Sequence, residues 1–166
     1  RALALGHRRI GAVLGPQNPS TGRSREVALR AALAAKGISL DAEVVRHGPF
    51  DTAAGDAATA ELLALTDPPT LVFCGNDVMA YGALNAARRA GASVPDDISI
   101  IGFDDLPPAS WPILELSTIA YDYVQMAREA GRLMVERIEE RPQEFAHVEF
   151  ATTFVERRTL SAPRAR

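Results

Sequence analysis

Several polar side chains with useful hydrogen-bonding chemistry follow short apolar runs of the sequence. Carboxylates accept hydrogen bonds from hydroxyl groups, asparagine amides both donate and accept, and an arginine guanidinium donates two bonds in parallel. A nearby aromatic ring can cover the apolar face of a sugar or a heterocycle. This mixture is typical of a site for a neutral small molecule. The candidate binding residues are Thr21, Arg23, Arg25, Phe50, Asn76 and Asp104.

These candidates also have structural interpretations that the sequence leaves open. Asn76 and Asp77 start a helix-like segment and suit a cap, and Asp104 and Asp105 are frequent turn formers. Phe50 is of a type found more often in a core than at a ligand. Arg23 and Arg25 start a helix-like segment, where a cation opposes the helix macrodipole. That unfavourable placement favours a functional reason for the two arginines.

Motifs of common enzymes are absent from the sequence. It contains no G-x-G-x-x-G after an apolar run, no phosphate-binding G-x-x-x-x-G-K-[ST] and no G-x-S-x-G. His7, His47 and His147 lie far apart and lack the spacing of metal ligands. We therefore expect a protein that is not an enzyme, with no cofactor and no metal site.

The elements that must position the candidates are short apolar runs that alternate with helix-like segments. The runs are mostly continuous and not alternating, which indicates strands buried on both faces, as in a parallel sheet. The alternation predicts an α/β fold, a doubly wound parallel sheet flanked by helices. In such sheets ligands bind beyond the carboxyl ends of the strands, where the candidates lie. Strands are predicted over 10–14, 43–46, 71–74 and 98–103, and helices over 23–36, 52–65 and 77–90; residues 17–22 are predicted as a polar loop.

The two ends of the chain break this alternation. Residues 1–5 are predicted as the last turn of a helix that Gly6 stops, so the chain is expected to begin inside an element. Towards the C-terminus, the longest helix is predicted over 122–140, with an apolar stripe along one side. An irregular stretch is predicted over 106–114, strands over 116–120 and 148–155, and a frayed tail over 157–166.

Composition is that of an ordinary globular protein. The 166 residues suit one domain or one lobe of a larger protein, with 47% hydrophobic and 23% charged residues. No run of about 18 apolar residues occurs, so no membrane span is expected. The single cysteine, Cys74, excludes an internal disulfide. A net charge of −3 argues against strong DNA binding by this chain alone.

Five segments, taken together and in order, resemble motifs of the lactose-repressor (LacI/GalR) family of bacterial transcriptional regulators. They are GHRRIG (6–11), PTLVFCGNDVMAYGAL (69–84), VPDDISIIGFDD (94–105), LSTI (116–119) and FVERRT (154–159). The resemblance implies the C-terminal lobe of a periplasmic-binding-protein-like I fold over 1–120. It also implies that the long helix in 121–142 belongs to the N-terminal lobe, that 143–158 close the C-terminal lobe, and that 159–166 form a tail.

The resemblance further implies a function and a set of residues. Family members are cytoplasmic homodimers that bind a small-molecule effector, here sugar- or nucleoside-like, and operator DNA through a headpiece that this chain lacks. Arg25, Asn76 and Asp104 match motif residues that bind the effector, and Phe50 lies where an aromatic ring stacks on it. The residues implied in addition are Tyr121 and Tyr123 for the ligand cleft, and Tyr81, Asn85 and Trp111 for the dimer interface.

Two other functions remain as alternatives. Periplasmic sugar-binding proteins of ABC transporters share the fold, although the Gly-His-Arg-Arg and Val-Pro-Asp-Asp-Ile-Ser segments favour the regulators. An enzyme on a doubly wound sheet is the third interpretation, and turnover by the purified protein is its direct test. Without the N-terminal lobe, the apolar stripe of the helix at 122–140 is expected to pack against a second copy of the chain.

Overall fold

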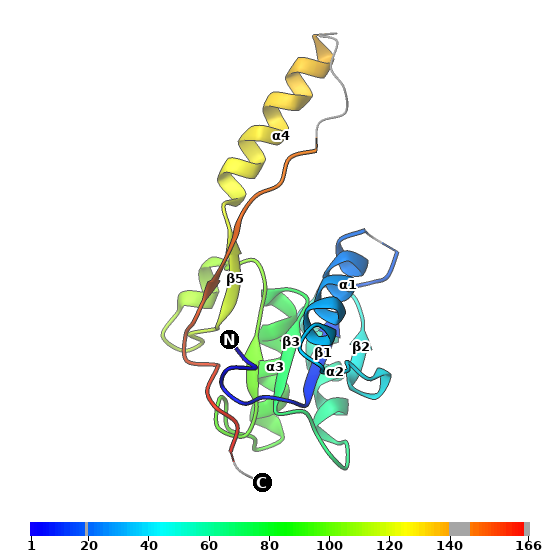
Figure 1. Ribbon diagram of the computed structural model, residues 1–166. Coiled ribbons are helices and arrows are strands. Elements are labelled where there is room, and N and C mark those ends of the chain that lie inside the picture. The colour runs from blue at the N-terminus through cyan, green and yellow to red at the C-terminus, as the bar shows by residue number, and fades with distance from the viewer. Residues whose placement is uncertain (19, 140–146, 165–166) are drawn as a thin grey trace.

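The computed structural model describes residues 1–18, 20–139 and 147–164 (Figure 1). Its centre is a four-stranded sheet in which all neighbouring strands run parallel, in the order β2-β1-β3-β4. The prediction of a doubly wound parallel sheet is therefore confirmed. The strands are β1 (Ile10–Leu14), β2 (Val45–His47), β3 (Leu71–Cys74) and β4 (Ser99–Ile101).

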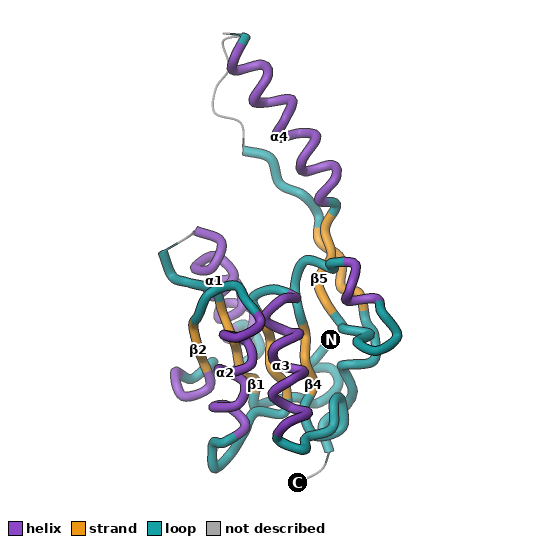
Figure 2. The backbone as a smooth tube through the Cα atoms, turned by 180° about the vertical axis from the view of Figure 1, so that it is seen from behind, coloured by secondary structure: helices purple, strands orange, loops and turns teal. Residues whose placement is uncertain are grey.

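Helices cover both faces of this sheet. In Figure 1 α1 lies in front of the strands, and in Figure 2, seen from behind, α2 and α3 lie in front of them. The strand order explains the placement, because the chain leaves β1 in one direction through α1 and then returns through α2 and α3 on the other side. The helices are α1 (Ser20–Ala34), α2 (Thr52–Leu63) and α3 (Asp77–Arg89), with a short 3₁₀ turn η1 (Ala42–Val44) before β2.

Helix α1 begins earlier than the sequence predicts. Its first turn includes Gly22, which was expected in a polar loop. A Cβ atom built on Gly22 would lie 2.2 Å from the carbonyl oxygen of Pro16, so only glycine lets this turn pack against the end of the loop. Gly22 is therefore a helix residue at a close backbone contact and not a loop residue.

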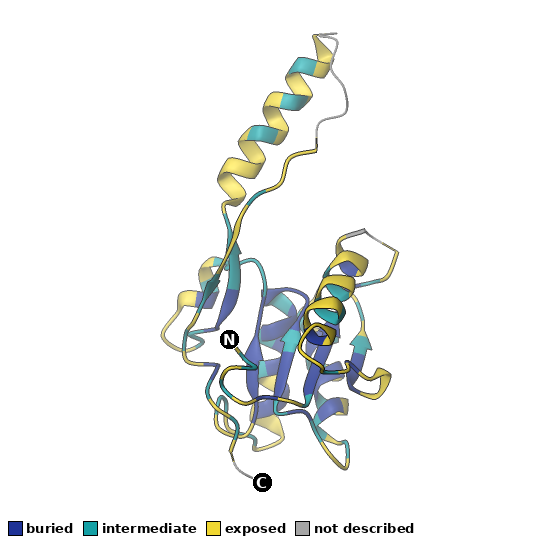
Figure 3. Ribbon diagram, in the orientation of Figure 1, coloured by how far each residue is buried: buried dark blue, intermediate teal, exposed yellow. Residues whose placement is uncertain are grey.

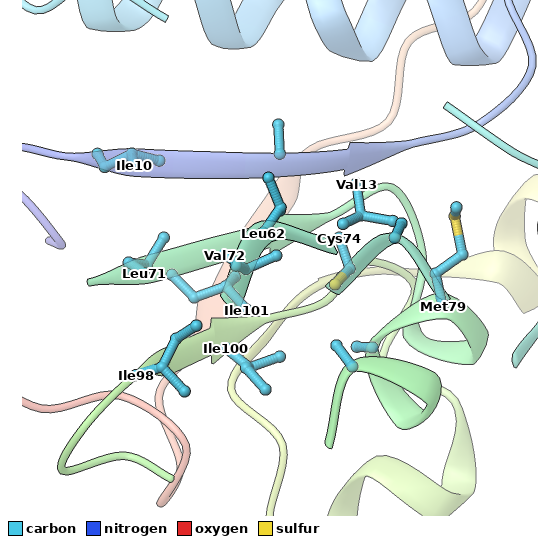
Figure 4. Close-up of a cluster of buried hydrophobic side chains, with 14 of the residues drawn as sticks. Ile10, Val13, Leu62, Leu71, Val72, Cys74, Met79, Ile98, Ile100 and Ile101 are labelled. Atoms are coloured by element: carbon cyan, nitrogen blue, oxygen red, sulfur yellow. The ribbon is translucent and has the colours of Figure 1, made fainter. Parts of the chain in front are cut away.

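The hydrophobic core lies between the sheet and its helices. All five residues of β1 are buried, and Cys74 at the end of β3 is fully buried. Figure 4 shows Cys74 among the side chains of β1, β3 and β4, with Leu62 and Met79 contributed by helices, and Figure 3 shows burial concentrated in the sheet. Burial raises the pKa of the Cys74 thiol, which is consistent with the small core hydrophobe expected from its strand position.

The segment around Thr159 packs against the sheet, so the prediction of a frayed tail is wrong for this part of the chain. Thr159 and Leu160 are buried, and the carbonyl oxygen of Thr159 accepts a hydrogen bond from the backbone N–H of Ile100 at 2.8 Å. The fully buried His7 ring holds this segment too, with 2.8 Å contacts to Thr70 Oγ1 and to the carbonyl oxygen of Ser161. Desolvation lowers the pKa of His7, so its role is structural, as expected.

A narrow antiparallel ribbon leaves the sheet region and carries a separate long helix (Figure 1). Strand β5 (Thr118–Tyr121) pairs with β6 (Thr152–Val155), and parallel bridges also join the start and end of this segment to Ile101 and Asp104. Helix α4 (Tyr123–Ile138) follows β5, and its apolar side chains are exposed, Met134 at 65% and Ile138 at 73%. The assignment of this helix to another lobe, and its packing on a second copy, remain predictions; the expected helix end at 140 lies outside the described residues.

Two further features complete the chain. The predicted irregular stretch contains a short 3₁₀ helix, η2 (Pro107–Ser110). Residues 1–6 form a hydrogen-bonded turn in which the N–H of Leu5 donates to the carbonyl of Arg1 at 3.0 Å, and Gly6 follows at a φ of 103°. This matches the expected helix stop. Across the described ranges, no helix is long and apolar enough to cross a membrane.

Helices α2 and α3 pack at unusually close range through two glycines. A Cβ built on Gly82 would lie 2.1 Å from the carbonyl oxygen of Thr52 and 2.6 Å from the backbone nitrogen of Asp56. A Cβ on Gly55 would lie 2.0 Å from the carbonyl oxygen of Met79. Because both neighbours are backbone atoms, a larger residue at either position forces the helices apart.

We predict that Gly82→Ala lowers the free energy of unfolding by about 2–3 kcal/mol, the upper part of the range for overpacked sites. Chemical denaturation measures the change. The matched control is Gly131→Ala in α4, where a Cβ meets nothing within 4 Å and alanine is the better helix former. Equal stability of Gly82→Ala and the wild type would show that the helices can separate without loss.

Candidate functional site

Most of the predicted binding residues gather at the carboxyl ends of the parallel strands. The first turns of α1, the residue Phe50 after β2, the N-cap of α3 and the turn after β4 all face this edge because each follows a strand end. The crossover strand β5 borders the same edge, since Asp104 and Ala120 form a parallel bridge. The site is thus assembled from four connections and one neighbouring strand.

Arg25 is the centre of the arrangement. Its guanidinium donates to the carbonyl oxygen of Gly75 and, at 3.3 Å, to Oδ1 of Asp104. The same group lies over the ring of Phe103, with Cζ 3.9 Å from the ring centroid, and 5.9 Å from that of Phe50. Such stacking leaves the edge of the guanidinium plane available for hydrogen bonds. The ion pair with Asp104 is long and partly exposed, so it is worth little as a stabilising contact.

Asp104 has an unusual backbone and two side-chain partners. Its φ is 117°, in the left-handed half of the map that residues with a side chain rarely adopt. Its carboxylate faces Arg25 and also accepts from the Tyr121 hydroxyl at 3.4 Å. Burial raises the pKa of Asp104, while Arg25 and Tyr121 oppose that shift, and burial together with the Asp104 charge raises the pKa of Tyr121.

Phe50 packs across the ends of the two central strands. A Cβ on Gly15, just after β1, would lie 1.9 Å from Cζ of the Phe50 ring, and one on Gly75, just after β3, would lie 3.4 Å from Cε1. The ring therefore sits on glycine backbone at the floor of the site, half-buried. The predicted position beside the ligand site is consistent with this packing, and so is the core-like interpretation of Phe50.

Asn76 has the capping role that the sequence left open. Its Oδ1 accepts from the backbone N–H of Met79 at 2.9 Å, and the residue is 9% exposed. The cap uses the carbonyl oxygen alone, so the two N–H donors of the amide take no part in it. The residue can therefore cap α3 and still donate to a ligand.

Three predicted residues are not joined to this cluster. Thr21 and Arg23 are exposed on the first turn of α1. Tyr123 is 50% exposed at the start of α4, and the hydrogen bonds that Asp104 makes to side chains of the described residues involve Arg25 and Tyr121. Arg23 is exposed while Arg25 reaches the cluster because residues two apart point to different sides of a helix. Tyr121 lies on β5 beside the site, whereas Tyr123 lies beyond the end of the strand.

The sequence reasoning missed Phe103 and the full role of Asp77. The sequence predicts Phe103 only as the end of a strand, but its ring lies under Arg25 and 6.0 Å from that of Tyr121. The sequence predicts Asp77 as a possible cap, but it is fully buried and accepts from the backbone N–H of Leu106 at 2.8 Å and from Thr118 Oγ1 at 2.5 Å. Asn76-Asp77 and Asp104-Asp105 each follow a predicted strand, and this placement is the sequence signal that the two turns lie at one edge of the sheet.

The chemistry available at this edge is that of a hydrogen-bonding site with aromatic walls. A guanidinium, a carboxylate, a phenol and a primary amide can recognise hydroxyl groups in both senses, and two phenyl rings can cover apolar surface. Among the described residues, no group of three or more His, Cys, Asp or Glu side chains is arranged to hold a metal ion.

Comparison with known proteins defines the class. Residues 1–160 match the periplasmic binding protein-like domain, so the chain belongs to that family. Within it the chain falls in the LacI/GalR group, because the similar proteins are repressors of that group. It is 40% identical over 134 residues to the HTH-type transcriptional repressor CytR of Escherichia coli K12, covering 81% of this chain and 39% of that protein. It is 36% identical over 159 residues to the repressor PurR of Pectobacterium carotovorum, covering 96% and 47%.

Solved structures agree with this assignment. The complex of the transcriptional regulator CelR with cellobiose superposes with a TM-score of 0.90 at 33% identity, over 96% of this chain and 49% of that one. A LacI regulator from Bacillus cereus gives a TM-score of 0.91 at 27% identity, over 96% and 57%. The chain spans less than half the length of the two curated relatives.

The buried Asp77 makes stability depend on pH. Desolvation raises its pKa from 3.8 to about 6, and the neighbouring charges of Asp104 and Asp105 add to that shift, while the bonds from Thr118 and Leu106 oppose it. The folded protein therefore keeps a proton that the unfolded chain has lost between about pH 4 and pH 6. The stabilisation by this group is fully present below pH 4 and is lost as the pH rises through 6.

We predict that Asp77→Asn removes this part of the pH dependence. Between pH 4 and pH 7 the free energy of unfolding of the wild type should fall relative to the variant by on the order of 2–3 kcal/mol. Urea unfolding of both proteins at several pH values measures it. Parallel curves for the two proteins would mean that Asp77 does not titrate in this range.

Proposed function

We propose that this chain is the effector-sensing region of a LacI/GalR-type transcriptional regulator. The observation that carries the proposal is the convergence of Arg25, Asp104 and Tyr121 on one another at the carboxyl edge of the sheet, between the rings of Phe50 and Phe103. The effector is a neutral small molecule of the sugar or nucleoside type, with adjacent hydroxyl groups.

The contacts in the site suit such a molecule. The Arg25–Asp104 contact at 3.3 Å is long for a charged hydrogen bond, so a ligand hydroxyl that donates to Asp104 and accepts from Arg25 replaces it at little cost. Asn76 supplies amide donors, and the phenyl rings cover the apolar face of a sugar or base. Backbone strain at Asp104 is typical of residues held in place for binding.

The similar proteins support a regulator over the alternatives. CytR and PurR are named as transcriptional repressors, and the CelR structure is a complex with cellobiose. These relatives favour a regulator over a periplasmic sugar-binding protein and over an enzyme. In this proposal the protein is cytoplasmic, and operator DNA is bound through a headpiece outside the 166 residues.

The effector is found by a thermal-shift screen of pentoses, hexoses, cellobiose, nucleosides and purines on the full-length regulator, because a ligand that binds the native state raises its melting temperature. A secretion signal in the full-length protein would instead select the periplasmic alternative, and an upstream helix-turn-helix would exclude it.

We predict that Arg25→Ala and Asp104→Ala each weaken binding of the effector found in that screen at least about tenfold. A hydrogen bond to a charged partner is worth roughly 1.5–3 kcal/mol, and the lower end corresponds to tenfold. Isothermal calorimetry measures the affinities. The control is Arg89→Ala, which breaks the ion pair of Arg89 with Asp56 between α3 and α2, away from the site, and should leave affinity unchanged. Wild-type affinity in both site variants would discard the assignment.

We further propose that the chain associates through α3 and the segment around η2. The predicted interface residues lie there: Trp111 is 54% exposed, Asn85 is exposed, and Tyr81 is half-buried, with its hydroxyl oxygen turned into the chain. A groove of about 650 Å³ lies beside them, lined by Leu84, Asn85 and Ile113 among others. The lac repressor structure among the similar folds is a dimer bound to operator, which supports association.

The prediction for association is that Trp111→Asp shifts the full-length protein from dimer to monomer, because a charge in an apolar contact is left without a partner. Sedimentation velocity at several concentrations measures the state. A surface change on α1, Val27→Asp, is the control, since Val27 is 61% exposed on a different helix. An unchanged dimer in Trp111→Asp would remove this segment from the interface.

A further inference from the structure

The buried carboxylate of Asp77 bonds both to the end of the Asp104–Asp105 turn and to strand β5, which are separate parts of the candidate site. We propose that Asp77 is a positioning residue, which holds the Asp104–Asp105 turn against strand β5 so that Asp104 and Tyr121 remain opposite Arg25. The proposal rests on the function proposed above, and it assigns to Asp77 an action through other residues.

Asp77 forms hydrogen bonds at both ends of the Asp104–Asp105 turn. Its backbone N–H donates to the carbonyl oxygen of Phe103 at 2.7 Å, just before the turn, and its Oδ2 accepts from the N–H of Leu106 at 2.8 Å, just after it. Its Oδ1 accepts from Thr118 Oγ1 at 2.5 Å, at the start of β5. One residue at the first position of α3 therefore fixes the turn and the strand relative to each other.

The turn needs this support because its backbone is strained. Asp104 and Asp105 have φ values of 117° and 51°, two consecutive residues in a region that side chains disfavour. On its outer side the turn is held by the N–H of Asp104, which donates to the carbonyl of Ile119 at 2.9 Å. Among the described residues, the other contacts that hold the turn are those of β5 and the side-chain ion pairs Arg25–Asp104 and Arg157–Asp105.

The space for the carboxylate comes from a glycine. A Cβ on Gly102 would lie 2.2 Å from Oδ1 of Asp77, so this position of the strand end admits the carboxylate only when it lacks a side chain. A carboxylate also accepts two hydrogen bonds with no donor of its own, which matches one N–H and one hydroxyl donor. Gly102, Leu106 and Thr118 thus surround the Asp77 carboxylate with matching space and hydrogen-bond donors.

The charge at this position works against stability, which argues for a purpose other than packing. Burial and the charges of Asp104 and Asp105 raise the pKa of Asp77, and Tyr81 and Cys74 also lie within reach of its charge. The groups facing it from other elements are Thr118 and Tyr121 on β5, Arg157 after β6 through its ion pair with Asp105, and Arg25 on α1 through Asp104.

The test compares Asp77→Ala with Asp77→Asn in the ligand-free protein. Both remove the charge, but asparagine keeps an oxygen for the Leu106 N–H and an amide N–H for Thr118, whose hydroxyl turns to accept. Because both variants lack the charge, a difference between them reports the loss of the hydrogen bonds that hold the turn. The readouts are native-state hydrogen exchange at the Leu106 amide and a carboxyl NMR titration of Asp104.

In Asp77→Ala we expect the Leu106 amide to exchange at least tenfold faster relative to the amides of β3. We also expect the pKa of Asp104, which burial raises in the wild type, to fall towards its ordinary value as the turn opens to water. Asp77→Asn should restore both. Ser99→Ala is the control: Ser99 is buried at the opposite end of β4, where its hydroxyl bonds Ser161, so the variant should change neither readout selectively.

A second variant covers the case in which Asp77→Ala does not fold. Thr118→Val removes only the hydroxyl donor, and it should speed exchange of the Asp104 amide, because that amide bonds to Ile119 on the strand that Thr118 anchors. Identical exchange and identical Asp104 titration in the alanine and asparagine variants overturn the proposal, as does unchanged Asp104 exchange in Thr118→Val. Both readouts are measured without a ligand, so this test can succeed or fail independently of the effector screen.

Discussion

The structure depends on burying both faces of a four-stranded parallel sheet. Parallel strands need crossover helices, and the helices cover the two faces and return every strand in the same direction. All carboxyl ends therefore meet at one edge, where the connections after β1, β2, β3 and β4 begin. The gathering of Arg25, Phe50, Asn76 and Asp104 at that edge follows from the burial requirement, before any ligand enters the argument.

The parts of this arrangement that follow from period and burial could be predicted from the sequence. Continuous apolar runs indicated β1 and β3 with their observed bounds, and the helix predicted over 77–90 matches α3 to within one residue. What failed was decided by contacts between distant segments. Gly22 is helical because it crosses the Pro16 carbonyl, and Thr159 is ordered because it pairs with β4. Neither partner is visible from local composition.

The same distinction applies to the site. Residue types and their places after predicted strands made Arg25 and Asp104 candidate binding residues, and the sheet topology explains why the two side chains lie close together. Phe103 and Asp77 could not be assigned in the same way, since their roles depend on side-chain direction at the end of β4 and on a hydrogen bond to β5 across 41 positions of sequence. Thr21 and Arg23 stay predictions: they lie on the first turn of α1 but apart from the Arg25 cluster, Arg23 because a helix turns residues two apart to different sides.

The ribbon of β5 and β6 joins α4 to the sheet region through four residue pairs, and one of its strands borders the turn that carries Asp104. A helix of 16 residues is about 24 Å long. For a helix of this length, a rotation of about 10° at the ribbon displaces the far end by roughly 4 Å. A small rotation at the ribbon therefore corresponds to a large displacement at the far end of α4, and the strand about which it occurs is paired with Asp104 through Ala120.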